Sequence, residues 1–145
     1  MDRPVIIVDL DGTLCNTDHR QHHLEKTPKD WKNFFAGIPN DPVVKIVEYF
    51  IDQMGGHNEI VFLTGRMQKF RNVTKDWLEN LALDEIELHM RTDDDFRPDT
   101  IVKQELYEKF ILPRKVALVL EDRTSVVKMW RSLGLKCWQV ADGDF

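Results

Sequence analysis

Short runs rich in apolar residues alternate along this chain with segments in which apolar side chains recur at helical spacing. Five such runs predict strands: 5–8, 60–63, 86–90, 116–120 and 135–140. A continuous apolar run of this length is typical of a strand that is buried on both faces. The pattern therefore indicates a mostly parallel sheet that is covered on both sides.

Four segments between the strands carry an apolar stripe and predict helices: 43–54, 70–81, 101–110 and 126–133. We expect Asp41 and Pro42 to cap and begin the first helix, and Asp99 to cap the third. Gly55 and Gly134 are expected to end the first and the fourth. The alternation predicts an α/β fold, a doubly wound and mostly parallel five-stranded Rossmann-like sheet.

One segment, residues 13–40, does not follow this alternation. It is rich in histidine and aromatic residues, and residues 27–30 predict the start of a short helix that carries Trp31, Phe34 and Phe35. Loops longer than about 12 to 15 residues in compact domains are usually functional. We interpret residues 14–40, approximately, as a small helical cap insert after the first strand of a single domain spanning 1–145.

Composition limits the classes of partner. The 145 residues include 20 Lys and Arg against 25 Asp and Glu, a net charge of -5. This balance argues against a protein that holds long nucleic acid by charge neutralisation, and leaves a short phosphorylated ligand open. The two cysteines, Cys15 and Cys137, have no metal-type spacing and predict a reducing, cytoplasmic environment.

The sequence contains no signal for a membrane. The first apolar run ends at Asp9 and is too short for the core of a signal peptide, and no run approaches the ~18 apolar residues of a membrane span. We therefore expect no membrane partner, while the sequence specifies no particular oligomeric state.

Two carboxylates follow the first predicted strand in the sequence Asp9-Leu10-Asp11-Gly12-Thr13. If the strand geometry continues, Asp9 and Asp11 point to the same side, toward the crevice where open α/β sheets bind ligands. Gly12 allows the chain to turn close to an anionic group.

Other polar residues fall at or beside the ends of later strands. Thr64 and Gly65 follow the second strand, Glu121 and Asp122 follow the fourth, and Lys103 lies on the helix between them. Acidic residues that converge at one sheet edge repel one another unless a divalent cation lies between them. Hard oxygen ligands favour Mg²⁺.

These motifs resemble those of the haloacid dehalogenase (HAD) superfamily: DLDGT, the threonine of LTGR, Lys103 and EDR match its four motifs in order. The segments WLENLA, MRTDDDFRPDTIVKQE and EDRTSVVKMWRSLGLKCWQVADGDF are similar to the 3′-phosphatase domain of bacteriophage polynucleotide kinase-phosphatase. The resemblance spans nearly the whole chain. No G-x-x-x-x-G-K-[ST] motif occurs in it, so we expect no 5′-kinase activity from these residues.

The resemblance implies a covalent mechanism. Asp9 would attack phosphorus and form an aspartyl-phosphate, which divides one displacement into two. Asp11 would protonate the leaving oxygen and then deprotonate the hydrolytic water. Mg²⁺ would be held by the carboxylates of Asp9 and Asp122 and by the backbone carbonyl of Asp11. Glu121 stands where the family often has aspartate, and its longer arm favours a contact to the metal through water.

The resemblance also implies that Thr64, the N–H of Gly65 and Lys103 hold the phosphoryl oxygens. Arg66 is a further candidate for this role, with the capping of a helix as its alternative. For Arg91 and Arg97, which flank an acidic loop, contact with phosphate and a solvated position both stay open.

Other residues carry weaker signals. His19, His22 and His23 have a spacing that suits a transition metal, but no cysteine or carboxylate set completes a tetrahedral site, so we expect exposed cap residues. The cap aromatics favour core packing over stacking of a nucleobase. Cys15 has no activating neighbour and is interpreted as an inert thiol.

The preferred function is Mg²⁺-dependent hydrolysis of a phosphomonoester, with a 3′-phosphorylated polynucleotide end as the leading substrate. The first alternative is a nucleoside monophosphate phosphatase. A receiver-like phospho-accepting module is less favoured, because the DxDGT sequence lies at the first strand. A non-catalytic end-binding subunit is less favoured, because both Asp9 and Asp11 are present. The sequence leaves open whether a kinase or ligase on a separate chain is a further partner.

Overall fold

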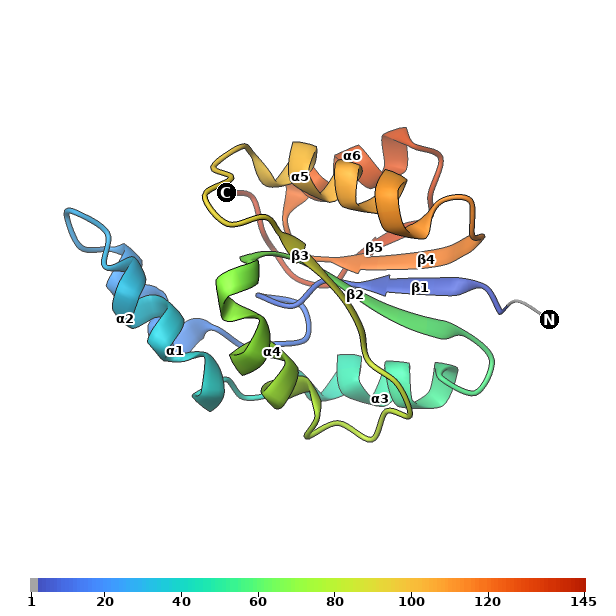
Figure 1. Cartoon of the computed structure of the whole chain (residues 1–145), viewed down its shortest axis with the longest axis horizontal. Coiled ribbons are helices and arrows are strands. Elements are labelled where there is room, and N and C mark those ends of the chain that lie inside the picture. The colour runs from blue at the N-terminus through green and yellow to red at the C-terminus, as the bar shows by residue number, and fades with distance from the viewer. Residues whose placement is uncertain (1–2) are drawn as a thin grey trace.

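The computed structural model describes residues 3–145, and its five strands form one parallel sheet (Figure 1). The strand order is β3-β2-β1-β4-β5, so the first strand lies in the middle. The strands are β1 (Val5–Val8), β2 (Glu59–Met67), β3 (Glu87–Arg91), β4 (Val116–Glu121) and β5 (Cys137–Gln139). This arrangement confirms the predicted doubly wound α/β fold, with each strand in the expected region of the chain.

The longer helices cover the two faces of the sheet (Figure 1). Helices α3 (Lys45–Met54) and α4 (Arg71–Leu78) lie on one face, and α5 (Asp99–Leu106) and α6 (Thr124–Ser132) lie on the other. Helix α4 is preceded by the 3₁₀ turn η3 (Gln68–Phe70), and α5 continues into a π-helical turn, η4 (Tyr107–Ile111).

The side chains of β1 alternate between two hydrophobic cores. Val5 and Ile7 join the core beneath α5 and α6, whereas Ile6 and Val8 join the core beneath α3 and α4. All four residues are buried, which explains why the strand is uniformly apolar. A strand buried on both faces fixes where its carboxyl end emerges, and Asp9 follows immediately.

The segment between β1 and α3 consists of short helical turns that extend beyond the sheet on the side of α4 (Figure 1). They are α1 (Asp18–Gln21), η1 (His22–Leu24), α2 (Trp31–Ala36) and η2 (Ile38–Asn40). The side chain of Asp30 accepts a hydrogen bond from the backbone N–H of Asn33 and so caps α2. The short helix that was expected after residues 27–30 is therefore present and begins at Trp31.

Two predicted helix caps are wrong. Helix α3 begins at Lys45 after Val44, without a side-chain cap, because the carboxylate of Asp41 is bound elsewhere by an arginine. Helix α5 begins with Asp99 itself, whose carboxylate also binds arginines. The predicted helix ends are confirmed: Gly55 follows α3, and Gly134 has a φ of +81° after α6.

The pairing of β2 with β3 is interrupted at the carboxyl end of β2. Thr64 pairs with Met90 and Met67 pairs with Arg91, so Gly65 and Arg66 form a bulge between them. Bulges change the direction in which side chains point and are frequent next to active sites.

Within residues 3–145, no helix combines the length and the apolar character that crossing a lipid bilayer requires.

Candidate active site

Three carboxylates meet at the carboxyl edge of the sheet. Asp9 follows β1 directly, Glu121 is the last residue of β4, and Asp122 comes next; β1 and β4 are adjacent and parallel. Each of the three offers an oxygen within 4.8 Å of the others, and all three are buried. The structure thus brings together the acidic residues that the sequence placed at separate strand ends.

One lysine lies among these carboxylates. The Nζ atom of Lys103 donates to Asp9 Oδ1 and to Glu121 Oε2, both at 2.9 Å, and the side chain is 3% exposed. Burial alone would lower the pKa of Lys103, but the two carboxylates raise it above its ordinary value, so the lysine is charged.

The remaining negative charge in this cluster is only partly compensated. Burial, with the charge of Glu121, raises the pKa of Asp9 to about 7, and burial next to Asp9 raises the pKa of Asp122 to about 7. Carboxylates that are buried together favour protonation unless a cation joins them. The three oxygen donors therefore fit a hard divalent cation such as Mg²⁺.

Two residues of the turn after Asp9 hold this cluster in place. The hydroxyl of Thr13 donates to Asp9 Oδ2 at 3.0 Å and lies 3.5 Å from Asp122 Oδ1. Gly12 has a φ of +83°, and a Cβ atom there would lie 2.1 Å from Asp122 Oδ2. The glycine was predicted from the motif, whereas the bridging role of Thr13 was not.

Asp11 has a different set of partners. Strand β1 ends at Val8, so the strand geometry does not continue to Asp11. The Oδ1 atom of Asp11 accepts hydrogen bonds from Arg66 Nη2 at 2.5 Å and from Arg20 Nη2 at 2.8 Å. Burial raises its pKa, but the guanidinium groups of Arg66 and Arg20 outweigh this and lower it below the ordinary value. The side chain is 34% exposed, so solvent or a ligand has access to it.

Behind Asp11 lies a buried ion pair that sequence reasoning missed. Arg20 donates to both oxygens of Asp41 at 2.7 Å, and the side chains of Arg20 and Asp41 are 1% and 0% exposed. His19 Nε2 lies 2.6 Å from Asp41 Oδ1. Arg66, the predicted phosphate ligand, joins the same group at 3.6 Å from Asp41 Oδ2. No local motif marks Arg20, because its two partners lie nine and 21 positions away in sequence.

Thr64 and Gly65 lie at the bulge in β2. Thr64 is buried, and its hydroxyl accepts the backbone N–H of Arg66 at 3.2 Å. A Cβ atom on Gly65 would lie 2.7 Å from Asp99 Oδ1, so a side chain there would displace the carboxylate of the first residue of α5. The end of β2 and the start of α5 are thus packed closely at this glycine.

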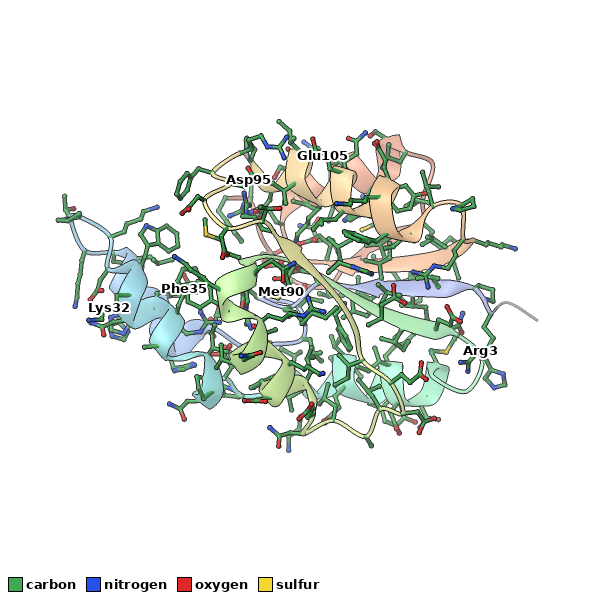
Figure 2. All side chains as sticks on the ribbon, viewed as in Figure 1. Arg3, Lys32, Phe35, Met90, Asp95 and Glu105 are labelled. Carbon is green, nitrogen blue, oxygen red and sulfur yellow. The ribbon has the colours of Figure 1, made fainter. Side chains whose placement is uncertain are left out.

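The other two arginines that the sequence singled out are bound to the protein itself. Arg91 donates to the carbonyls of Gly65, Asp95 and Arg97 and to the carboxylate of Asp99. Arg97 binds the carboxylates of Asp95 and Glu105, two side chains labelled in Figure 2. None of these partners belongs to the cluster of Asp9, so the structure does not bring Arg91 and Arg97 to it.

The histidines do not join a metal-type group in the described part of the chain. The two groups of potential ligands found in residues 3–145 contain no histidine: one is the cluster of Asp9, and the other is Asp11, Cys15 and Asp41. The second group has its carboxylates bound by arginines, and burial raises the pKa of the Cys15 thiol. Cys15 is fully buried, which agrees with the interpretation as an inert thiol.

The chain is similar to known phosphatase domains over nearly its whole length. The family model for the polynucleotide kinase PNKP phosphatase domain matches residues 3–145. A relative from Autographa californica nuclear polyhedrosis virus, named as a bifunctional polynucleotide kinase/RNA ligase, is 30% identical over 132 residues. The match covers 88% of this chain but 18% of the viral protein.

Solved structures agree with this relationship. Two, described as the Pnkp1/Rnl/Hen1 complex and the Pnkp1/Rnl/Hen1 RNA repair complex, each align with 99% of this chain at a TM-score of 0.82 and at 31% and 32% identity. The chain spans less than half of each, 48% and 44%. A haloacid dehalogenase-like hydrolase from Streptococcus pneumoniae aligns with 97% of this chain and 87% of its own at a TM-score of 0.68 and 13% identity, which shows a shared fold.

The buried pair generates a prediction about stability. We expect Arg20→Ala to lower the free energy of unfolding by about 3 kcal/mol, because it leaves the carboxylate of Asp41 buried without its two-point partner. The measurement is urea denaturation followed by circular dichroism. Arg71→Ala is the matched control, since within residues 3–145 the side chain of this arginine makes a single long hydrogen bond, 3.4 Å to Gln68, and its loss should change the value by less than about 0.5 kcal/mol. Equally small losses in both variants would contradict the role assigned to Arg20.

Proposed function

We propose that this chain, which belongs to the family of polynucleotide kinase PNKP phosphatase domains, removes the 3′-phosphate from polynucleotide ends. The family makes it a HAD-type phosphatase, that is, a phosphoric monoester hydrolase. The observation that carries the mechanism is the buried group of Asp9, Glu121 and Asp122 around Lys103, with the carboxylate of Asp11 held separately by two arginines.

Asp9 is the proposed nucleophile. One of its oxygens attacks phosphorus, and the bond from phosphorus to the leaving oxygen breaks, which produces an aspartyl-phosphate. Thr13 and Lys103 hold the two oxygens of Asp9 in fixed positions, so little reorganisation is required before attack. The charged lysine also favours the ionised carboxylate that a nucleophile requires.

Asp11 is the proposed acid and base. It gives a proton to the leaving oxygen in the first half of the reaction and takes one from the attacking water in the second. Before substrate arrives, Arg20 and Arg66 keep it ionised. A phosphoryl group placed nearby offers the arginines competing oxygens, which weakens their hold on Asp11 and allows its pKa to rise.

Mg²⁺ is the proposed metal, held by the carboxylates of Asp9 and Asp122 and by the backbone carbonyl of Asp11. When bound, it would supply positive charge for the phosphoryl oxygens and for the ionised form of Asp9. Glu121 is occupied by Lys103 and by the backbone N–H groups of Asp122 and Arg123, which supports a contact to the metal through water.

The proposed phosphoryl-binding groups are the hydroxyl of Thr64, the N–H of Gly65 and Lys103, with Arg66 beside them. Preorganised donors of this kind act on the charge that develops in the transition state. Arg91 stabilises the backbone of this region, because its guanidinium donates a hydrogen bond to the carbonyl of Gly65. We accordingly assign Arg91 and Arg97 to shaping the loop, in place of the phosphate contact considered from the sequence.

The segment from α1 to η2 is proposed to act as the cap of this single domain. Arg20 in α1 reaches Asp11 directly, so the cap contributes a side chain to the site. The viral relative is named as a kinase and ligase, and the solved relatives belong to a complex described as an RNA repair complex. We infer from these names that a kinase or ligase works together with this phosphatase.

The first prediction from this mechanism concerns Asp9. We expect Asp9→Asn to reduce hydrolysis of an aryl phosphate to background, because the anionic nucleophile and a metal ligand are lost together. Hydrolysis is measured from the absorbance of the released phenol, with and without excess chelator. Asp76→Asn, an exposed aspartate on α4, is the matched control and should keep full activity. Substantial turnover by Asp9→Asn, or by the wild type in chelator, would refute the covalent metal-dependent mechanism.

The second concerns proton transfer. Asp11→Asn should slow turnover by about 10² to 10⁴-fold, the usual contribution of general acid-base catalysis. The loss should be smaller for an aryl phosphate than for an alkyl phosphate, since a phenolate leaves without much protonation. Thermal unfolding checks that the variant stays folded although Arg20 and Arg66 have lost the charge of their carboxylate partner. Equal losses on both substrates would exclude the acid role.

The third concerns the substrate. We expect 3′-phosphorylated oligonucleotides to be hydrolysed faster than 5′-phosphorylated ones, with kcat/KM nearly independent of length beyond a few nucleotides. The net charge of -5 limits contacts with backbone phosphates. With one or two contacts at about -0.7 each, the logarithm of affinity should fall with the logarithm of salt concentration at a slope near -1. Equal rates at both ends, or turnover of mononucleotides alone, would favour the nucleotidase alternative.

A further inference from the structure

Three aromatic rings are stacked between the segment after β1 and the body of the protein. The ring of Phe35 lies 5.8 Å from that of Trp31 at an interplanar angle of 21°, and 4.3 Å from that of Phe70 at 25°. Trp31 and Phe35 belong to α2, and Phe70 belongs to η3, directly after β2. In Figure 2, Phe35 lies on the side of α2 that faces the sheet domain. We call these three residues the aromatic ladder.

The aromatic ladder differs from the buried core of this segment in that one of its rings is exposed. Phe34, next to Phe35, is 6% exposed and packs edge-on against Trp31, which fits the core packing expected from the sequence. Trp31 is 49% exposed. About half of the surface of Trp31 is therefore accessible to a ligand.

A lysine lies over the ring at each end of the ladder. Lys29 Nζ is 5.6 Å from the centre of the Trp31 ring, and Lys69 Nζ is 5.4 Å from the centre of the Phe70 ring. Lys32, which points outward from α2 in Figure 2, adds a third ammonium group. Among residues 3–145, the lysines that form ion pairs are Lys26 and Lys103, so the ammonium groups of Lys29, Lys32 and Lys69 have no carboxylate partner there. On a chain of net charge -5, this is a local concentration of positive charge.

The ladder is connected to the catalytic residues by direct contacts. The ring of Phe34, whose centre is 5.2 Å from that of Phe35, lies 4.4 Å from the guanidinium carbon of Arg20. Arg20 in turn donates to Asp11. Phe70 follows the strand that carries Arg66, the other arginine on Asp11. The ladder therefore lies within a few nucleotide lengths of the proposed site of hydrolysis.

We propose that the aromatic ladder is a stacking platform for the bases next to the terminal phosphate of a single-stranded nucleic acid, a site that rests on the proposed function. Every base has a π-face, so stacking on Trp31 binds single strands with little dependence on sequence. Lys29, over the ring of Trp31, and Lys69, over the ring of Phe70 at the other end, bind phosphates of the same strand. A single strand carries flat bases next to anionic phosphates, which matches a stack of rings with an ammonium group at each end.

The decisive variant is Trp31→Ala, with Trp138→Ala as its matched control, because Trp138 is 51% exposed and also packs near a phenylalanine ring, 5.8 Å from Phe50. Each is assayed on an aryl phosphate and on a 3′-phosphorylated oligonucleotide. Trp31→Ala should lower kcat/KM for the oligonucleotide by about 5- to 100-fold, which is the usual contribution of stacking one base on an aromatic side chain. It should leave kcat/KM for the aryl phosphate unchanged. Trp31→Phe should restore most of the loss. Trp138→Ala should alter neither activity.

Abasic substrates test the contact from the side of the ligand. Oligonucleotides with a single abasic site at the first, second, third or fourth nucleotide from the 3′ end are compared on the wild type and on Trp31→Ala. At one position, the abasic site should lower kcat/KM of the wild type by about the same factor as Trp31→Ala does. Combining that abasic site with Trp31→Ala should cause no further loss. Additive losses at every position, or no loss at any, would refute stacking on Trp31.

The lysines have a separate readout. Lys69→Gln should reduce the slope of the logarithm of oligonucleotide affinity against the logarithm of salt concentration by about 0.7, the value for one phosphate contact on a single strand. Affinity is measured by fluorescence anisotropy with Asp9→Asn as the background, so that substrate is not consumed. Lys128→Gln, an exposed lysine on α6, should leave the slope unchanged. An unchanged slope in Lys69→Gln would remove this lysine from the platform.

The outcomes separate the platform from the proposed function. A wild type that shows no preference for oligonucleotides over the aryl phosphate overturns the polynucleotide substrate itself. A wild type with that preference, combined with equal losses on both substrates in Trp31→Ala, retains the function and makes Trp31 a structural residue of the cap. A preference that Trp31→Ala does not change refutes the platform and retains the proposed function.

Discussion

The interaction on which the site depends is the burial of Lys103 between Asp9 and Glu121. Taking several charges out of water at one sheet edge costs several kcal/mol per ion unless each is closely paired. One lysine cannot compensate three carboxylates, and the raised pKa values of Asp9 and Asp122 express this imbalance. The parallel sheet causes it, because the carboxyl ends of β1 and β4 are adjacent. The fold thus accepts a locally unfavourable charge arrangement that a divalent cation would relieve.

The second charge group, two residues along the chain, has the opposite balance. Asp11 and Asp41 are matched by Arg20 and Arg66, so the group is neutral as a whole and the pKa of Asp11 falls. Neighbouring carboxylates whose environments push their pKa values apart are a common basis for separate catalytic roles. In the proposed mechanism, bound ligands reverse both pKa shifts, the rise at Asp9 and the fall at Asp11. A divalent cation held by Asp9 and Asp122 would favour the ionised form of Asp9, and a phosphoryl group would compete with Asp11 for the two arginines.

The sequence predicted features that depend on short-range patterns and on strand order. The five strands, the helix ends at Gly55 and Gly134 and the convergence of Asp9 with Glu121 follow from apolar runs and from parallel topology. The failures are long-range. Asp41 satisfied the local rule for a helix cap, but a buried arginine in a segment without regular periodicity bound its carboxylate instead. Arg91 was similarly considered for phosphate, although three carbonyls and Asp99 occupy it, and no pattern in the sequence reports backbone acceptors.

Arg20 connects the segment after β1 with the candidate site, because its side chain contacts the carbonyl of Phe34 in α2, the buried Asp41 and the carboxylate of Asp11. Its guanidinium also lies over the ring of Phe34, which packs against Trp31 and Phe35. The position of the cap and the charge environment of Asp11 are therefore coupled. In the proposed arrangement, a free phosphate would compete for the guanidinium without contacting the aromatic ladder, whereas a nucleic acid end would engage both. Coupling of this kind gives a phosphatase a physical means of favouring a phosphate that is attached to a strand over one that is not.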